Sequence, residues 1–124
     1  MEAADFFAGS PEALAIHREV ESAIERLGEA TTRATKSQVG FYRTRPFAAT
    51  WRPDQYLAGK HAPLVLTIYL DRRDNSPRWK EVVQPAKGRF THHLELYSSK
   101  DIDEFVRCFL EEAWEAAGQR RRST

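Results

Sequence analysis

The sequence predicts an α+β domain: a twisted antiparallel sheet of about five strands, with an N-terminal and a C-terminal helix packed on one face. Apolar residues recur three and four apart near both ends of the chain, whereas they alternate with polar residues between about 31 and 97. Two helices, each about 10 Å wide, cover only one face of five strands that together span roughly 24 Å. The other face is therefore expected to be open or occupied by a partner.

The N-terminal part of the chain predicts an arm followed by a helix. Residues 1–9 contain Phe6 and Phe7, which we expect to tuck into the core. Ser10 can cap the helix that follows, and Pro11 suits the first helical position. Its apolar residues keep helical spacing and it should end at Gly28. His17 is assigned to the solvent-facing side of this helix.

Five segments then show the alternation of strands. They cover residues 31–35, 39–44, 47–52, 64–70 and 90–97, and residues 53–62 form a loop. In the fourth segment, Leu64, Leu66, Ile68 and Leu70 share one side, as expected for a strand with one face in the core. Residues 79–85 fit either a short helical turn or an edge strand.

The closing helix is predicted by a capping-box pattern, in which Asp101 caps and Glu104 reaches back three residues. Cys108 lies in its apolar pattern and is interpreted as a small buried residue rather than a nucleophile. The helix should end at Gly118, and residues 119–124 form a basic disordered tail. The whole chain, 1–124, is predicted to be one domain.

Composition excludes several classes of protein. The chain has 41% hydrophobic and 30% charged residues, and no apolar run approaches the roughly 18 residues of a membrane span, so no membrane partner is expected. Its acidic start lacks the pattern of a signal peptide, which predicts a cytoplasmic protein. A single cysteine excludes an internal disulfide. The four histidines lack metal-site spacing, and no cofactor-binding motif is present, so neither a metal nor a cofactor is expected.

Charge is distributed unevenly although the net charge is +1. Residues 1–30 carry about −5, residues 31–100 about +8 and residues 101–124 about −2. This asymmetry fits an anion-binding sheet face, and it fits equally well acidic helices that complement a basic sheet.

The strand over residues 90–97 places two adjacent histidines on opposite faces, so they cannot act as a pair. His92 points to the apolar side, where a neutral buried imidazole bonded to backbone is expected. His93 points to the open face, together with Tyr69 and Tyr97. Such rings beside guanidinium groups suit bases, aromatic carboxylates or a second copy of the chain, although β-rich surfaces also use these residues routinely.

Five segments resemble a bacterial family known only as a domain of unknown function: FFAGSPEAL (6–14), TKSQ (35–38), FAATWRP (47–53), SPRWKEV (76–82) and GRFTHH (88–93). In that family the domain occurs alone or attached to a small helical domain in proteins labelled predicted transport proteins. The resemblance implies no established activity. Its pattern corresponds here to Lys36, Ser37, Gln38, Trp51, Arg52, Arg78, Lys80, Arg89, His92 and His93.

The leading hypothesis is a non-enzymatic binding module whose open sheet face receives an anionic small molecule or an acidic protein segment. The predicted ligand-binding residues are Lys36, Gln38, Trp51, Arg52, Arg78, Arg89, His92 and His93. Two alternatives stay open: binding of single-stranded nucleic acid, and a hydrolase or transferase that uses His93 as its base. No catalytic residue is assigned, and both a monomer and a homodimer fit the sequence.

Overall fold

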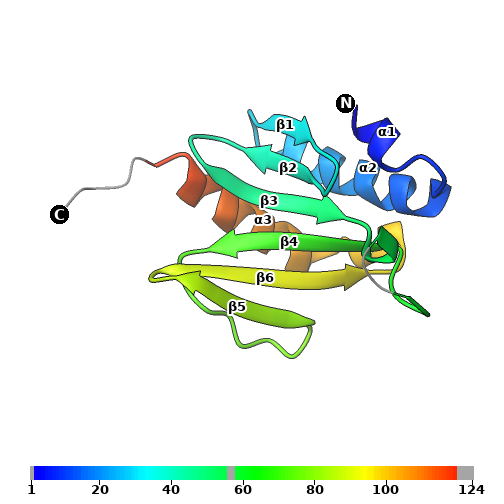
Figure 1. Ribbon diagram of the computed structural model, residues 1–124. Coiled ribbons are helices and arrows are strands. Elements are labelled where there is room, and N and C mark those ends of the chain that lie inside the picture. Colours follow the sequence, from blue (N-terminus) through cyan, green and yellow to red (C-terminus); the bar gives the residue numbers. More distant parts are fainter. Residues whose placement is uncertain (1, 56–57, 120–124) are drawn as a thin grey trace.

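The computed structural model of the chain describes residues 2–55 and 58–119. Within them, six strands form one antiparallel sheet in the order β1-β2-β3-β4-β6-β5, and the long helices α2 (Pro11–Glu25) and α3 (Glu104–Ala117) lie behind it (Figure 1). The strands are β1 (Thr31–Ala34), β2 (Val39–Tyr42), β3 (Pro46–Trp51), β4 (Leu64–Leu70), β5 (Glu81–Ala86) and β6 (Arg89–Leu96). The predicted α+β class and the placement of the two long helices on one face are confirmed.

The sheet has one strand more than the five clear ones in the sequence. The ambiguous segment 79–85 supplies it, because Glu81, Val82 and Val83 pair with His93, His92 and Thr91 of β6. Strand β5 lies at the edge of the sheet, where a proline such as Pro85 is tolerated because its missing N–H costs no ladder bond. This exposed, proline-containing edge strand explains why the local pattern was ambiguous.

Strand β4 lies inside the sheet and has one face in the core, as its alternation predicted for that face. It pairs with β3 on one side and β6 on the other. Leu64, Leu66, Ile68 and Leu70 are all buried, and α3 packs across β3 and β4 on the same face. The opposite side chains of β4 belong to the open face of the sheet.

The N-terminal arm behaves as expected, but His17 does not. Residues Ala3–Phe6 form a short helix α1, and Phe6 and Phe7 are buried. The Ser10 hydroxyl accepts the Ala13 N–H and caps α2. The prediction that His17 faces solvent is wrong, because its ring is fully buried, close to the Phe7 ring, with Nδ1 2.9 Å from Thr50 Oγ1.

The start of α3 also differs from the prediction. Asp103 caps the helix by accepting the Val106 N–H, while Asp101 forms a capping box with Ser98 around a preceding 3-10 turn, Ser99–Asp101. The prediction that Cys108 is buried is wrong: the thiol is exposed, since Val106 and Leu110 turn the other side of the helix toward the sheet. Residues 120–124 of the predicted tail lie outside the described residues.

No helix within residues 2–55 and 58–119 combines the length and the apolar character needed to cross a membrane.

Candidate functional site

A groove of about 730 Å³ lies on the face of the sheet that the helices leave open. Strands β3 to β6 supply its floor, and the β1–β2 turn and the loop before β4 supply its sides. The described lining residues are Ser37, Gln38, Trp51, Pro53, Lys60, His61, Val65, Thr67, Tyr69, Lys80, Glu81, Thr91, His93, Glu95 and Tyr97. This volume falls within the range of small-molecule sites, roughly 300–1,000 Å³.

Strand register places the polar floor of the groove in one row. Thr67 of β4 lies opposite His93 of β6, and His93 lies opposite Glu81 of β5. Directly opposite residues in an antiparallel sheet point to the same face, with Cβ atoms roughly 5 Å apart. Thr67, His93 and Glu81 therefore stand side by side across three strands.

A chain of hydrogen bonds orients His93. The Trp51 indole N–H donates to Thr67 Oγ1 over 2.9 Å, and Thr67 Oγ1 lies 2.8 Å from His93 Nδ1. Thr67 is buried, and among the described residues its hydroxyl has no other acceptor within hydrogen-bond distance, so we assign the hydroxyl as the donor and Nδ1 as the acceptor. The neutral imidazole therefore carries its proton on Nε2.

The protonated Nε2 atom of His93 reaches the groove. Among the described residues it has no hydrogen-bond partner, and it is not one of the fully buried polar atoms. Burial of the ring lowers the pKa of His93, and the nearby Glu81 carboxylate opposes that change. At neutral pH the groove therefore presents an uncharged N–H donor at this point.

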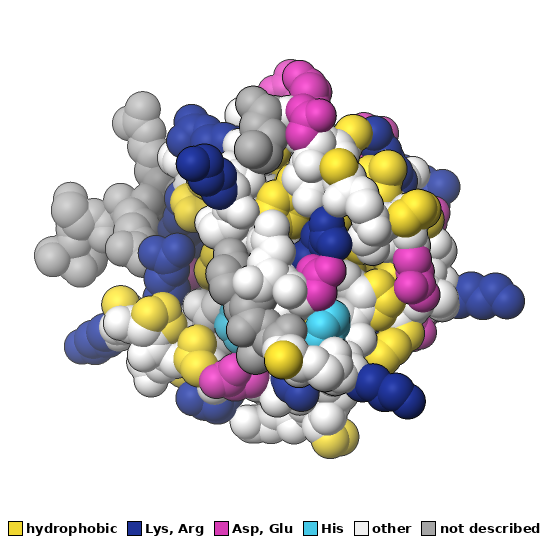
Figure 2. Space-filling view, turned by 45° about the vertical axis from the view of Figure 1, so that its right-hand side comes forward, with side chains coloured by type: hydrophobic (Ala, Val, Ile, Leu, Met, Phe, Trp, Pro, Cys, Tyr) yellow, Lys and Arg dark blue, Asp and Glu magenta, His cyan; other side chains and the backbone are white. Residues whose placement is uncertain are grey.

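The charges that line the groove balance one another among the described residues. Lys60 and Lys80 are opposed by Glu81 and Glu95, and Lys80 Nζ lies 3.7 Å from Glu95 Oε1. Figure 2 shows basic and acidic side chains interspersed around histidines near the centre of that view. Among the described residues, the lining therefore does not carry a single sign of charge, which an anion-binding face, one of the two interpretations of the basic middle of the sequence, would favour.

Tyr69 and Arg89 form one end of the open face. The Arg89 guanidinium carbon lies 5.1 Å from the centre of the Tyr69 ring. Burial raises the pKa of Tyr69, partly offset by Arg89, so the hydroxyl stays protonated near neutral pH. Tyr69 also lines a smaller pocket of about 240 Å³, which contains Arg45 and Arg89.

The structure brings together part of the predicted site. Gln38, Trp51 and His93 line the groove. Lys36 is exposed in the same β1–β2 turn as Ser37 and Gln38, and Arg89 lies over Tyr69 at the end of the open face. These five residues therefore lie in or beside the groove.

Two predicted arginines are engaged elsewhere. Arg52 pairs with Asp54 at 2.6 Å and also donates to the Ala8 carbonyl. Arg78 donates to both carboxylate oxygens of Asp103 at 2.9 Å, and so is tied to the cap of α3. Neither is among the described residues that line the groove, and both have a structural role in these contacts.

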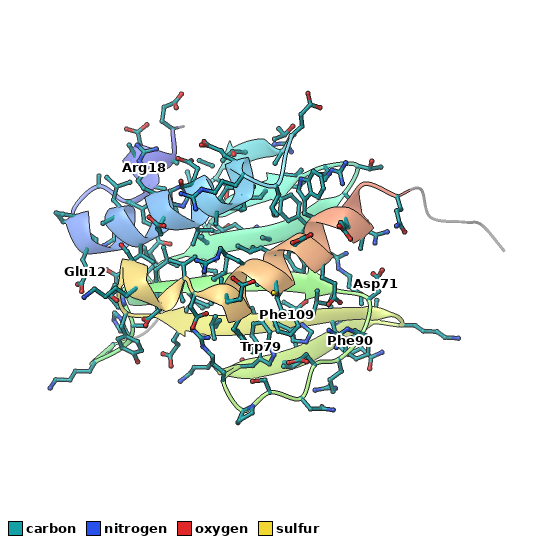
Figure 3. All side chains as sticks on the ribbon, turned by 180° about the vertical axis from the view of Figure 1, so that it is seen from behind. Glu12, Arg18, Asp71, Trp79, Phe90 and Phe109 are labelled. Carbon is teal, nitrogen blue, oxygen red and sulfur yellow. The ribbon has the colours of Figure 1, made fainter. Side chains whose placement is uncertain are left out.

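His92 faces the helices, as its position in the strand predicted. Its Nε2 accepts the Asp74 N–H over 3.0 Å, and its Nδ1–H donates to the Phe90 carbonyl over 3.3 Å. Burial lowers the pKa of His92 and favours the neutral ring. The ring packs edge-on against Trp79, which in turn contacts Phe109 of α3 (Figure 3). The expectation of a buried neutral imidazole bonded to backbone is confirmed, and the ring lies away from the groove.

Sequence reasoning missed part of the lining of the groove. The set of predicted site residues did not include Lys60, His61, Lys80, Glu81, Thr91 or Glu95. Alternation could have revealed Glu81, had residues 79–85 been assigned to a strand facing His93. Lys60 and His61 gave no local signal, because only the path of the loop after Pro53–Gln55 brings them to the groove. Among the described residues, no three His, Cys, Asp or Glu side chains are grouped to hold a metal ion.

One family model matches almost the whole fold. A family model described as a domain of unknown function, DUF5655, matches residues 3–117, which run from α1 to the end of α3. The chain belongs to this family. No curated protein and no solved structure matches the chain. The bacterial origin and the fusion to transport proteins stay predictions, and the groove must be interpreted from its own chemistry.

Proposed function

We propose that this DUF5655 domain is a binding module that holds a small organic molecule in the groove of its open sheet face, without a chemical step. The observation that supports it best is the Trp51–Thr67–His93 chain, which aims an accessible N–H donor into a groove of about 730 Å³. Binding sites of this size typically combine apolar walls with a few oriented polar groups.

The groove offers both kinds of contact. Tyr97 is 56% exposed, and it lines the groove together with Trp51 and Val65, so these side chains can cover the apolar body of a ligand. His93 and Gln38 supply polar contacts to fix its orientation. The oriented donor is rigid before binding, which reduces the entropy lost when a ligand is held.

The chemistry around His93 favours binding over catalysis. Within the described residues its Nδ1 is held by a threonine hydroxyl, whereas the histidine of a catalytic triad is oriented at that atom by a carboxylate. Balanced charges in the lining also distinguish the groove from the basic channels that follow the backbone of single-stranded nucleic acid. An anionic ligand would have to use Lys60 or Lys80, with Lys36 and Arg89 at the rim, against the two glutamates.

A fragment screen by thermal shift tests the proposal. Ligands that bind only the folded state must raise its melting temperature. At a concentration of roughly 100 times Kd, such a ligand increases the free energy of unfolding by about 2.7 kcal/mol. We expect hits to stabilise the native protein and the control variant Glu111→Ala, which changes an exposed residue of α3 on the other side of the sheet. The same hits should lose most of their effect in His93→Ala, measured against that variant's own melting temperature.

Three results would contradict the proposal. One is hits that stabilise His93→Ala as strongly as the native protein. Another is hits whose NMR shift changes cluster away from the open face. The third is binding confined to oligonucleotides with an affinity that falls steeply as salt is added, which would favour the nucleic-acid alternative.

A further inference from the structure

Next to the His93 donor the groove carries an unused acceptor. Glu81 lies directly opposite His93 in the β5–β6 register and lines the same groove. Among the described residues its carboxylate makes neither a hydrogen bond nor an ion pair, although it is close enough to act electrostatically on His93. A donor and an acceptor therefore stand side by side, both directed to the open face.

The two groups have fixed polarity. With the buried Thr67 hydroxyl assigned as the donor to Nδ1 of His93, Nε2 carries the proton and can only donate while the ring is neutral. An ionised carboxylate such as Glu81 can only accept. The ligand edge that satisfies both must present an acceptor beside a donor.

From this pairing we propose that the groove selects a neutral planar heterocycle with a carbonyl next to an N–H, as in a lactam. His93 Nε2–H donates to the carbonyl and the Glu81 carboxylate accepts the N–H, while Trp51 and Tyr97 cover the ring. This inference rests on the proposed small-molecule site and names the class of ligand it takes.

An anionic edge fits the same pair poorly. A ligand carboxylate that accepted from His93 would lie next to the Glu81 carboxylate, and like charges at this distance repel. The lactam edge avoids that repulsion and gives Glu81 a charge-assisted hydrogen bond. Glu81 therefore sets the preference between neutral and anionic ligands.

Three probes of one ring system separate these possibilities: 2-quinolone, N-methyl-2-quinolone and quinoline-2-carboxylate. Titrations followed by NMR, with the Trp51 indole N–H as reporter, give the Kd of each. The N-methyl compound keeps the carbonyl but lacks the donor for Glu81, and we expect it to bind about tenfold more weakly than 2-quinolone.

The variant Glu81→Ala should repeat that loss. It is expected to weaken 2-quinolone by about tenfold and to leave N-methyl-2-quinolone nearly unchanged, because the lost contact is the one that the methyl group already removes. The carboxylate probe should bind more tightly to Glu81→Ala than to the native protein. Glu111→Ala serves as the control and should bind all three as the native protein does. Glu81 is exposed on an edge strand, so the variant is expected to fold.

The outcomes distinguish this inference from the proposed function. Tightest native binding of the carboxylate, or equal binding of the two quinolones, overturns the lactam class and leaves a small-molecule site. The lactam class is also overturned if a wider library yields fragments that bind the groove and none of them carries the paired carbonyl and N–H. If neither the probes nor the library perturbs the groove resonances, the proposed function itself fails.

Discussion

Replacing Thr67 by valine tests the hydrogen-bond chain that orients His93. The substitution keeps the shape of the side chain and replaces the hydroxyl group by a methyl group. In the native structure that hydroxyl accepts the Trp51 indole N–H at 2.9 Å and lies 2.8 Å from His93 Nδ1. Thr67→Val therefore takes two hydrogen bonds away at once.

The expected loss of stability follows from these two bonds. Each contributes about 0.5–1.5 kcal/mol, which makes a total of about 1–3 kcal/mol. The added methyl group is buried, since Thr67 is only 3% exposed, and it returns at most about 0.8 kcal/mol. The partly buried Nδ1 of His93 also loses its donor, which adds a desolvation penalty, so we expect the free energy of unfolding to fall in the upper part of the resulting range, by about 1–2 kcal/mol.

Thr91→Val is the matched control. Thr91 also lines the groove, on the neighbouring strand, and among the described residues its hydroxyl makes no hydrogen bond. The same change of atoms there removes no hydrogen bond, so it should not lower stability, and the buried methyl group adds at most about 0.8 kcal/mol.

Urea unfolding of both variants measures the difference, and imidazole ¹⁵N shifts of His93 report which nitrogen carries the proton. Equal stability of the two variants, or a native His93 protonated on Nδ1, would refute the proposed chain.

Three further predictions concern the rest of the fold. Burial in the folded state lowers the pKa of three histidines, so below about pH 6.5 the unfolded state binds more protons than the folded state. The free energy of unfolding should therefore be full above about pH 6.5 and fall as the pH decreases toward the lower pKa values of the folded state. The fall is up to about 1.4 kcal/mol per pH unit for each histidine. The three are His17, His92 and His93, and urea unfolding across this pH range would contradict the reasoning if stability stayed constant. Gly28→Ala should lower the free energy of unfolding by about 1–3 kcal/mol, because φ is +145° and the new Cβ would lie 2.6 Å from the Trp114 ring. Gly9→Ala is the control: φ is +90°, no atom lies within 4 Å of the new Cβ, and the expected loss is about 1 kcal/mol. Thermal unfolding of both variants measures the difference. Arg78→Ala should cost only about 1 kcal/mol, since its pair with Asp103 is partly exposed, and should leave ligand binding unchanged; a loss of binding would return Arg78 to the site.

Local pattern was sufficient for most of the fold. The alternation in residues 64–70 predicted a strand with one face in the core, and Ser10 before Pro11 predicted the start of α2. Both depend on neighbouring residues alone, because side-chain direction and helix capping repeat with the backbone geometry. The same geometry separated His92 from His93 and predicted their opposite environments.

Predictions that depended on distant partners were less successful. His17 is polar and was placed in solvent, yet Thr50 from β3 supplies a hydrogen-bond partner, and the Phe7 ring packs against it. Arg52 was assigned to the rim of the site, and in the structure its guanidinium donates to the carbonyl of Ala8, far away in the chain, as well as pairing with Asp54. Burial of a polar group depends on whether a partner is available, and that partner can come from anywhere in the chain.

By itself, the sequence determined which side chains of each strand share a face, and hence that His93, Tyr69 and Tyr97 lie opposite the helices. Only the tertiary structure decided that Thr67, His93 and Glu81 form one row, because strand register is set by pairing between segments that lie far apart in the chain. The same pairing joins a donor from one strand to an acceptor from another, and the chemistry of the groove comes from that juxtaposition.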